Sequence, residues 1–250
     1  MFQKVKKLIV FIFVVSISST GCQHINKSKV NSSNTVPEII ASRIVPKDII
    51  ATNLSFDAST GKIQYTLPHA AWVRLRIGIK NGGALLTHIL DWEFRAPGNH
   101  MEQWDFKNQT GDVYFGQRKD FIIVFRALAV EDKRNISWQM INGYHKTPKI
   151  DVFFPQSIGK TKDGHPIVKG VAPIRVMVHK EDNRWLTETK FEVGLYIDQA
   201  FLMEDEEGRN PFTYQWNTEG LREGLHTITV NVLGYQGEAG TKSVRVFVEK

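Results

Sequence analysis

The chain has 250 residues, of which 42% are hydrophobic and 11% aromatic, and it carries a formal net charge of +6 at pH 7. This composition can fill folded cores and excludes a chain that is disordered throughout. Lys4, Lys6 and Lys7 supply half of the net charge, so the remaining chain carries only +3, which argues against a nucleic-acid partner. Cys22 is the only cysteine, and the chain can therefore form no internal disulfide.

Residues 1–21 have the pattern of an export signal peptide. The three lysines precede an apolar run at residues 8–15 (LIVFIFVV), which is too short for a membrane span of about 20 residues. The tetrapeptide STGC at residues 19–22 resembles the lipobox of bacterial lipoproteins, although the position of Ser19 usually carries Leu. The resemblance implies that Cys22 is acylated and becomes the new amino terminus. An ordinary signal peptide that happens to contain a cysteine is the alternative.

A lipoprotein cysteine carries two or three acyl chains, which anchor a protein stably where one chain would not. The resemblance therefore implies a protein that is attached to the membrane of the bacterial cell envelope through its lipid anchor. Residue 23 is Gln, not the Asp that often retains such proteins at the inner membrane, so we expect the outer membrane if the source is Gram-negative.

Residues 22–47 are expected to form a flexible tether behind the lipidated cysteine. They are rich in Ser and Asn, are interrupted by Pro37 and Pro46, and contain little apolar surface to offset the entropy of ordering the chain.

Residues 48–130 are predicted to form a first β-sandwich. Alternating or continuous apolar residues, separated by Gly- and Pro-containing turns, predict strands at residues 62–67, 72–79, 85–92, 102–106 and 121–130. In the second of these, Val73 and Leu75 would face the core, and Arg74 and Arg76 would lie on a wet face.

Several short motifs in this region occur in one order: IQYTLP at residues 63–68, DW at 91–92, PGNH at 97–100 and WD at 104–105. Together they resemble the immunoglobulin-like domain of the flagellar hook-cap protein, a module found in many exported bacterial proteins. The family usually carries Gly where this chain has Phe106, so we expect a different turn after Trp104. The resemblance implies a fold and no catalytic residues.

A linker is expected at residues 131–148, followed by a second β-sandwich at residues 149–250. Apolar patterning predicts its strands at residues 150–154, 174–178, 191–197, 212–216, 226–232 and 244–248. The segments PFTYQWNT (residues 211–218) and GLHTITV (residues 224–230) resemble the immunoglobulin-like repeats of bacterial surface proteins. The predicted fold class is thus all-β, with two tandem immunoglobulin-like β-sandwiches after a lipoprotein signal peptide and a tether.

Sequence motifs for catalysis give no positive signal. No His-Glu-x-x-His, Gly-x-Ser-x-Gly or paired-cysteine metal spacing occurs, and the only thiol is the one expected to be acylated. We therefore expect no catalytic residues and a protein that is not an enzyme.

One acidic segment could hold a metal ion. Asp198, Glu204, Asp205 and Glu206 offer carboxylate oxygens, which calcium prefers. The alternative is a solvated acidic loop between two strands, and we otherwise expect no cofactor.

Aromatic side chains outside the clear strand cores could stack on sugar rings. Trp138, Tyr144 and Trp185 are the candidates, whereas Trp72, Trp92, Trp104 and Trp216 are expected to fill the sandwich interiors.

These patterns predict a non-catalytic, lipid-anchored envelope protein that presents its sandwiches as a binding or spacer surface to a protein partner. A carbohydrate-binding accessory lipoprotein, with a polysaccharide as its partner, is the second hypothesis.

Overall fold

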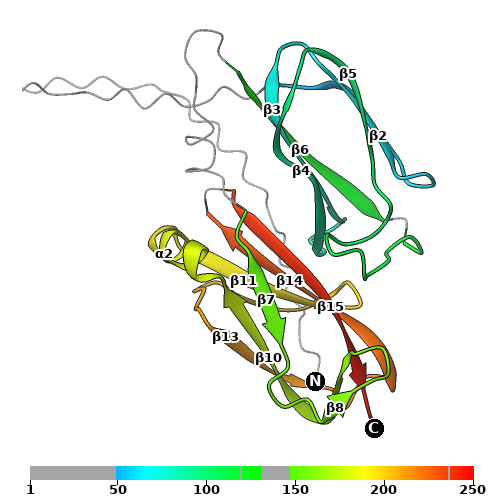
Figure 1. Ribbon diagram of the computed structural model, residues 1–250, viewed down its shortest axis with the longest axis vertical. Coiled ribbons are helices and arrows are strands. Elements are labelled where there is room, and N and C mark those ends of the chain that lie inside the picture. The colour runs from blue at the N-terminus through cyan, green and yellow to red at the C-terminus, as the bar shows by residue number, and fades with distance from the viewer. Residues whose placement is uncertain (1–48, 119, 131–146, 236) are drawn as a thin grey trace, which may run out of the picture. The chain divides into compact units, whose positions relative to one another are not determined.

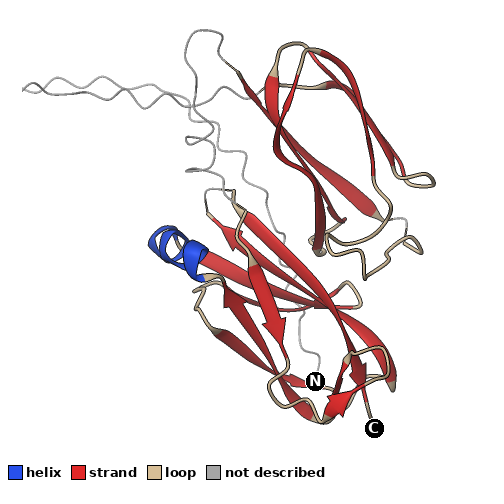
Figure 2. Ribbon diagram, in the orientation of Figure 1, coloured by secondary structure: helices blue, strands red, loops and turns tan. Residues whose placement is uncertain are grey.

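The computed structural model describes residues 49–250, apart from residues 119, 131–146 and 236. The predicted signal peptide, the predicted tether (residues 22–47, with Cys22) and most of the predicted linker lie outside the described residues. Residues Pro46–Lys250 form one compact unit. Its described residues lie mostly in β-strands, as Figure 2 shows, which confirms the all-β prediction.

The first sandwich consists of two three-stranded sheets. One has the order β1-β2-β5, made of β1 (Thr52–Asp57), β2 (Lys62–Leu67) and β5 (Gly98–Gln103). The other has the order β4-β3-β6, made of β4 (Leu85–Arg95), β3 (Ala71–Ile79) and β6 (Phe121–Ala129), and all neighbouring strands in both sheets are antiparallel.

The core of the first sandwich is filled by the apolar positions that the sequence alternation predicts. Tyr65 of β2, Leu75 of β3 and Trp104 are at most 2% exposed and belong to one cluster. The indole of Trp104 packs edge-on against Phe121, with ring centroids 4.9 Å apart.

The second sandwich pairs a three-stranded sheet, β13-β10-β7, with a six-stranded sheet, β12-β11-β14-β15-β9-β8. The smaller sheet comprises β7 (Ile150–Phe153), β10 (Val171–Val178) and β13 (Phe212–Asn217). The larger sheet comprises β8 (Gly159–Lys160), β9 (Pro166–Val168), β11 (Phe191–Ile197), β12 (Ala200–Asp205), β14 (Gly224–Gly234) and β15 (Ala239–Val248). Trp216 lies in the core between the two sheets and is 1% exposed.

A helix, α2 (Lys180–Thr189), interrupts the strands after β10 and was not predicted. Its residue Leu186 is completely buried in the core of the second sandwich, so the helix covers that core instead of lying in solvent. Asp182 is also buried, and its carboxylate accepts the backbone N–H of Lys149 at 2.9 Å and the indole N–H of Trp185 at 3.2 Å.

Several predicted strands differ from the observed ones. The strand expected at residues 102–106 is wrong, because β5 begins at Gly98 and ends at Gln103, paired with β2 from Leu67↔Gly98 to Lys62↔Gln103. Phe106 follows with a φ of 62°, the left-handed conformation that a Gly would adopt most easily. Strand β12 was also missed, and it extends into the acidic segment as far as Asp205.

The expected tryptophan positions are confirmed in part. Trp104 and Trp216 fill the two sandwich cores. Trp92 is buried at 2% exposure, but it forms a separate cluster with Leu128 and the half-buried Trp72. Trp72 and Leu128 are paired across β3 and β6, and the alternation of β3 puts Trp72 on the face opposite to the core residue Val73. Trp92 has no Cα partner at the irregularity between Val73 and Arg74 in the β3–β4 register. In the described part of the chain, no helix is long and apolar enough to cross a membrane.

Candidate functional site

The junction between the two sandwiches is built from polar side chains of β14 and β15. Asn231 of β14 and Thr241 of β15 are at least 92% buried, and both bind the carbonyl oxygen of Leu85, at 2.8 Å and 2.7 Å. The Asn231 amide oxygen also accepts the backbone N–H of Leu85 at 2.8 Å. The first residue of β4 is therefore held through its backbone by the second sandwich.

A second connection comes from the loop after β5. The side-chain oxygen of Asn108 accepts the backbone N–H groups of Asp112 and Val113, both at 3.1 Å, which fixes the loop. Its amide nitrogen donates to the carboxylate of Asp112 at 2.7 Å and reaches the carbonyl oxygen of Ser243 in β15 at 3.4 Å.

The prediction that Arg74 and Arg76 lie on a solvent-exposed face of β3 is wrong. Arg74 is only 3% exposed: its guanidinium donates to Asp91 at 2.8 Å and to the Gly237 carbonyl of the β14–β15 turn at 3.2 Å. It also lies over the ring of Trp92, with 4.6 Å between the guanidinium carbon and the ring centroid. Arg76 donates to the same Gly237 carbonyl at 3.0 Å. This face is covered by the second sandwich, which the alternation of β3 alone could not indicate.

Two buried nitrogen atoms beside Arg74 have no hydrogen-bond partner in the part of the chain that the structure describes. Among the described residues, the buried Nε atom of Arg76 has no hydrogen-bond partner, and burial together with the neighbouring charge of Arg74 lowers the pKa of Arg76. The Nε2 atom of His88, the cross-strand partner of Arg76, is also buried and has no hydrogen-bond partner within the described ranges. Burial, and then the charge of Arg76, lowers the pKa of His88 to about 3, so this imidazole is neutral at pH 7.

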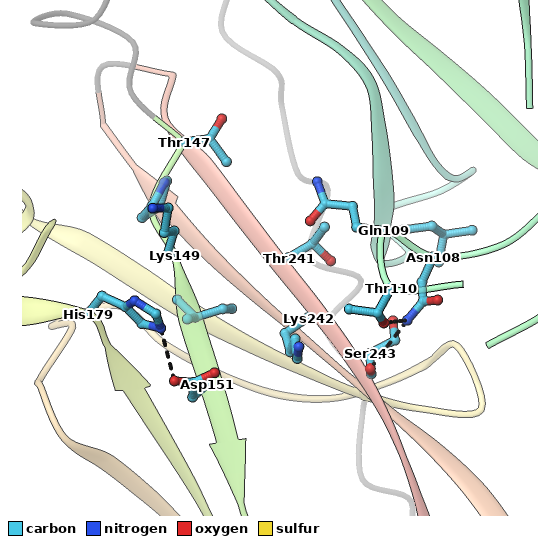
Figure 3. Close-up of a pocket in the computed structure, with 13 residues that line it drawn as sticks. Asn108, Gln109, Thr110, Thr147, Lys149, Asp151, His179, Thr241, Lys242 and Ser243 are labelled. Carbon is cyan, nitrogen blue, oxygen red and sulfur yellow. Dashed lines mark hydrogen bonds and ion pairs between the residues drawn. The ribbon is translucent and has the colours of Figure 1, made fainter. Parts of the chain in front are cut away.

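A cavity of about 230 Å³ lies beside this junction, as Figure 3 shows. Its walls come from the loop after β5 (Asn108, Gln109 and Thr110), from the chain entering β7, from the start of α2 and from β15. Gly240 lets the chain before β7 approach β15, because a Cβ atom at this position would lie 2.4 Å from the carbonyl oxygen of Pro148. We call this cavity the junction groove.

Among the described residues, some charged groups at the junction groove have a direct partner of opposite charge and one does not. His179 Nε2 lies 2.9 Å from a carboxylate oxygen of Asp151, and the ammonium of Lys149 lies 3.1 Å from Glu181. Lys242 of β15 is half-buried, and it forms no hydrogen bond or ion pair with any residue of the described ranges. Within the described ranges, the positive charge of Lys242 therefore borders the groove without a direct bond, and it acts at longer range on the carboxylate of Asp112.

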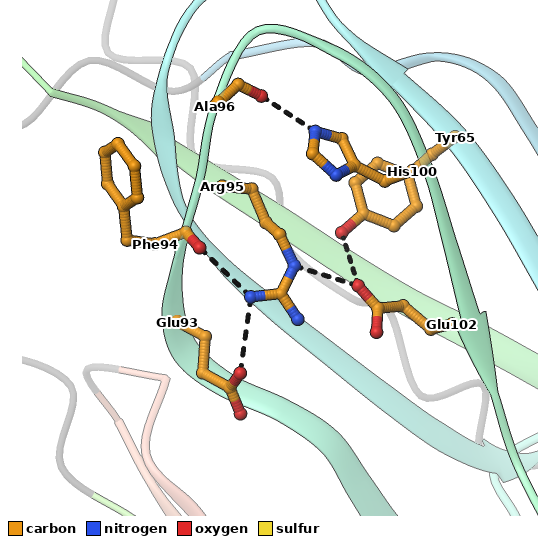
Figure 4. Close-up of polar contacts among 7 residues, drawn as sticks. All are labelled: Tyr65, Glu93, Phe94, Arg95, Ala96, His100 and Glu102. Carbon is orange, nitrogen blue, oxygen red and sulfur yellow. Dashed lines mark hydrogen bonds and ion pairs between the residues drawn. The ribbon is translucent and has the colours of Figure 1, made fainter.

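A second polar cluster lies at one end of the first sandwich (Figure 4). The Arg95 guanidinium donates to Glu102 at 2.9 Å, to Glu93 at 3.3 Å and to the Phe94 carbonyl at 3.0 Å, and the hydroxyl of Tyr65 donates to Glu102 at 3.0 Å. Burial and the negative charge of Glu102 raise the pKa of Tyr65. Since Arg95 lies in one sheet and Glu102 in the other, this cluster joins the two sheets and has a structural explanation.

The structure does not bring the predicted calcium ligands together. Asp198 lies in the β11–β12 turn, where it binds His226 at 2.7 Å, whereas Glu204 and Asp205 lie at the other end of that hairpin. Asp205 accepts the backbone N–H groups of Glu207 and Gly208, and Glu206 is exposed. No three His, Cys, Asp or Glu residues gather around a possible metal position within the described ranges.

Of the three predicted sugar-stacking aromatics, only Trp185 lies within the described residues. Trp185 is half-buried on α2 against the core of the second sandwich, so it offers no open ring platform. Trp138 and Tyr144 lie outside the described residues. The groove residues were missed by sequence reasoning, because Lys242, His179 and Asp151 are far apart in the chain and match no motif.

No protein-family model matches the chain, and neither does any curated protein. Among solved structures, the chain is 15% identical to an endo-β-1,4-mannanase from Thermotoga petrophila, with a TM-score of 0.30, over 41% of this chain and 20% of that one. It is 15% identical to the fibronectin(III)-like modules of Clostridium thermocellum CbhA, with a TM-score of 0.30, over 80% of this chain and 94% of that one. The Endo-D glycoside hydrolase domain from Streptococcus pneumoniae R6 is 8% identical, with a TM-score of 0.24, over 74% of this chain and 31% of that one. This chain thus spans about a fifth of the mannanase, and similarity at these values indicates nothing about activity.

Proposed function

We propose that this protein is a non-catalytic, lipid-anchored envelope protein whose two sandwiches act together as a binding or spacer body for a protein partner. The observation that carries the proposal is the junction, where Asn231 and Thr241 bind both backbone polar groups of Leu85. Bonds to backbone atoms fix one sandwich on the other, because they do not depend on a flexible side chain at Leu85. Such a body holds the surfaces of the two sandwiches in one fixed arrangement.

Strands at the ends of sheets offer a route to a protein partner, because one side of each has no neighbouring strand. β5 ends the sheet β1-β2-β5, and β12 ends the six-stranded sheet. Both carry an exposed apolar side chain: Met101 is 61% exposed and Phe201 is 58% exposed. These features suit contact with another protein.

In-cell cross-linking followed by mass spectrometry tests the proposal, with Cys22→Ala as the control. We expect the unaltered protein to carry lipid on Cys22 and to yield a reproducible protein partner, and the variant to lose the lipid and that partner. Recovery of polysaccharide or cell-wall material without any protein would reject the proposal in favour of the carbohydrate-binding hypothesis.

A further inference from the structure

The volume of the junction groove restricts what it can hold. At about 230 Å³ it is smaller than the roughly 300–1,000 Å³ of pockets that enclose drug-sized ligands. Residues of both sandwiches line it, so an occupant of this size would contact both. The groove therefore suits one small molecule, or one functional group of a larger molecule.

The polar groups that line the groove favour a negatively charged occupant. The carboxylate that lines the groove, that of Asp151, already lies 2.9 Å from Nε2 of His179. On the first sandwich, Asn108 and Thr110 donate to Asp112 at 2.7 Å and 2.5 Å. No residue of the described ranges accepts a hydrogen bond from the ammonium group of Lys242, although its charge acts at longer range on the carboxylate of Asp112. The ammonium group of Lys149 has three N–H donors and bonds to Glu181 at 3.1 Å. The side chains that line the groove thus include two lysines and one carboxylate.

We propose that the junction groove binds the carboxylate or phosphate group of a small anionic ligand, with Lys242 as its main contact and Lys149 as a second cation. The charge-assisted hydrogen bonds of an ammonium group to such oxygens are about twice as strong as neutral ones. Because both sandwiches line the groove, an occupant stabilises the junction as well. This site is additional to the protein-binding role proposed above and does not depend on the lipid anchor.

Titration calorimetry on the intact protein in detergent tests this proposal, with inorganic phosphate and glucuronate as separate probes. We expect saturable binding of at least one probe and a midpoint of thermal unfolding that rises with its concentration. Binding of phosphate alone or of glucuronate alone would support the site and identify the group that it prefers. Raised sodium chloride should weaken the binding.

The matched variants are Lys242→Met and Lys162→Met. Lys162 is an exposed lysine in the β8–β9 turn of the same sandwich and does not line the groove. We expect Lys242→Met to raise the dissociation constant at least tenfold and Lys162→Met to leave it unchanged. The proposal is overturned if neither probe binds saturably, or if both variants bind like the unaltered protein.

Discussion

Asn231 and Leu85 meet across the junction in a two-way hydrogen bond: the amide side chain accepts the Leu85 N–H at 2.8 Å and donates to the Leu85 carbonyl at 2.8 Å. Asn is suited to this position because its side-chain amide presents a carbonyl acceptor and an N–H donor side by side, and its second N–H donates to Thr241 at 3.0 Å. It thus pairs with the first residue of β4 as a neighbouring strand would.

Asn231→Ala should destabilise the junction, because it leaves two backbone groups of Leu85 with fewer partners. An unsatisfied buried polar group costs about 1–3 kcal/mol, so we expect a loss of that size in the free energy of unfolding. Chemical denaturation measures it, and Gln215→Ala, which truncates an exposed amide on β13, is the control. Asn231→Asp should be at least as harmful, since a carboxylate cannot donate to the Leu85 carbonyl. Equal stability of all three variants would contradict this role.

The stability of the protein should fall with acid because of His88. Its pKa is lowered to about 3 in the folded protein, whereas the unfolded value is near 6.5. Below pH 6.5 the unfolded chain therefore binds a proton that the folded chain does not, and stability is lost as the pH falls toward 3. The slope is up to about 1.4 kcal/mol per pH unit.

Unfolding free energies of the unaltered protein and His88→Gln, measured from pH 7 to pH 4, isolate this contribution. The groups around the imidazole are Arg74, Arg76, Asp91, and Gln109, whose amide lies 3.0 Å from Nδ1. Their titration should be nearly common to both proteins, so the difference between the two curves reports on His88. Parallel curves over this range would show that the imidazole becomes protonated in the folded state without penalty.

Replacement by Met should change the free energy of unfolding differently at the two arginines of β3. Arg74→Met should cost about 2 kcal/mol, below the 3–5 kcal/mol of a fully buried pair, because the Asp91 side chain is 38% exposed. Arg76→Met should change stability by less than about 1 kcal/mol, or increase it, since it removes a half-buried charge whose Nε atom has no hydrogen-bond partner among the described residues. Denaturant midpoints of the two variants compare them directly. A larger loss for Arg76→Met would show that its bond to Gly237 outweighs the burial of its charge.

The core and the strands were largely predictable, because the alternation of apolar residues records which side of a strand faces its own core. Residues 62–67 and 191–197 were predicted with the bounds that the structure shows. The junction could not be predicted in this way. Asn231, Thr241 and Arg74 have the polar character of a solvent-exposed face, yet they are covered by another part of the same chain. One sequence pattern fits both situations, and only tertiary structure separates them.

Helix α2 was missed for a different reason. Residues 180–189 (KEDNRWLTET) have few apolar side chains, and the helix is held by Leu186 in the core and by the buried Asp182. A short helix in water gains little stability from helix propensity alone, so the packing of α2 against the sandwich is what stabilises it. The junction groove was missed because its walls are brought together only by the docking of the sandwiches.

His226 should be one of the most sensitive single positions of the second sandwich. Its side chain is 2% exposed, and its two ring nitrogens face Asp198 at 2.7 Å and the Arg222 carbonyl at 2.9 Å. Asp198 lies in the turn between β11 and β12 with a φ of 48°, and its carboxylate also accepts the Thr227 N–H at 2.9 Å. The imidazole therefore connects that turn to β14.

His226→Ala should lower the free energy of unfolding by about 2–4 kcal/mol, because it removes two buried hydrogen bonds and leaves a cavity. His226→Phe separates the two causes, since it fills the space without restoring the bonds, and it should recover only part of the loss. Thermal and denaturant unfolding measure both variants beside His69→Ala, which truncates an exposed histidine and should leave the unfolding midpoint unchanged. Full recovery of stability in His226→Phe would mean that packing, and not the bridge to Asp198, is what this position supplies.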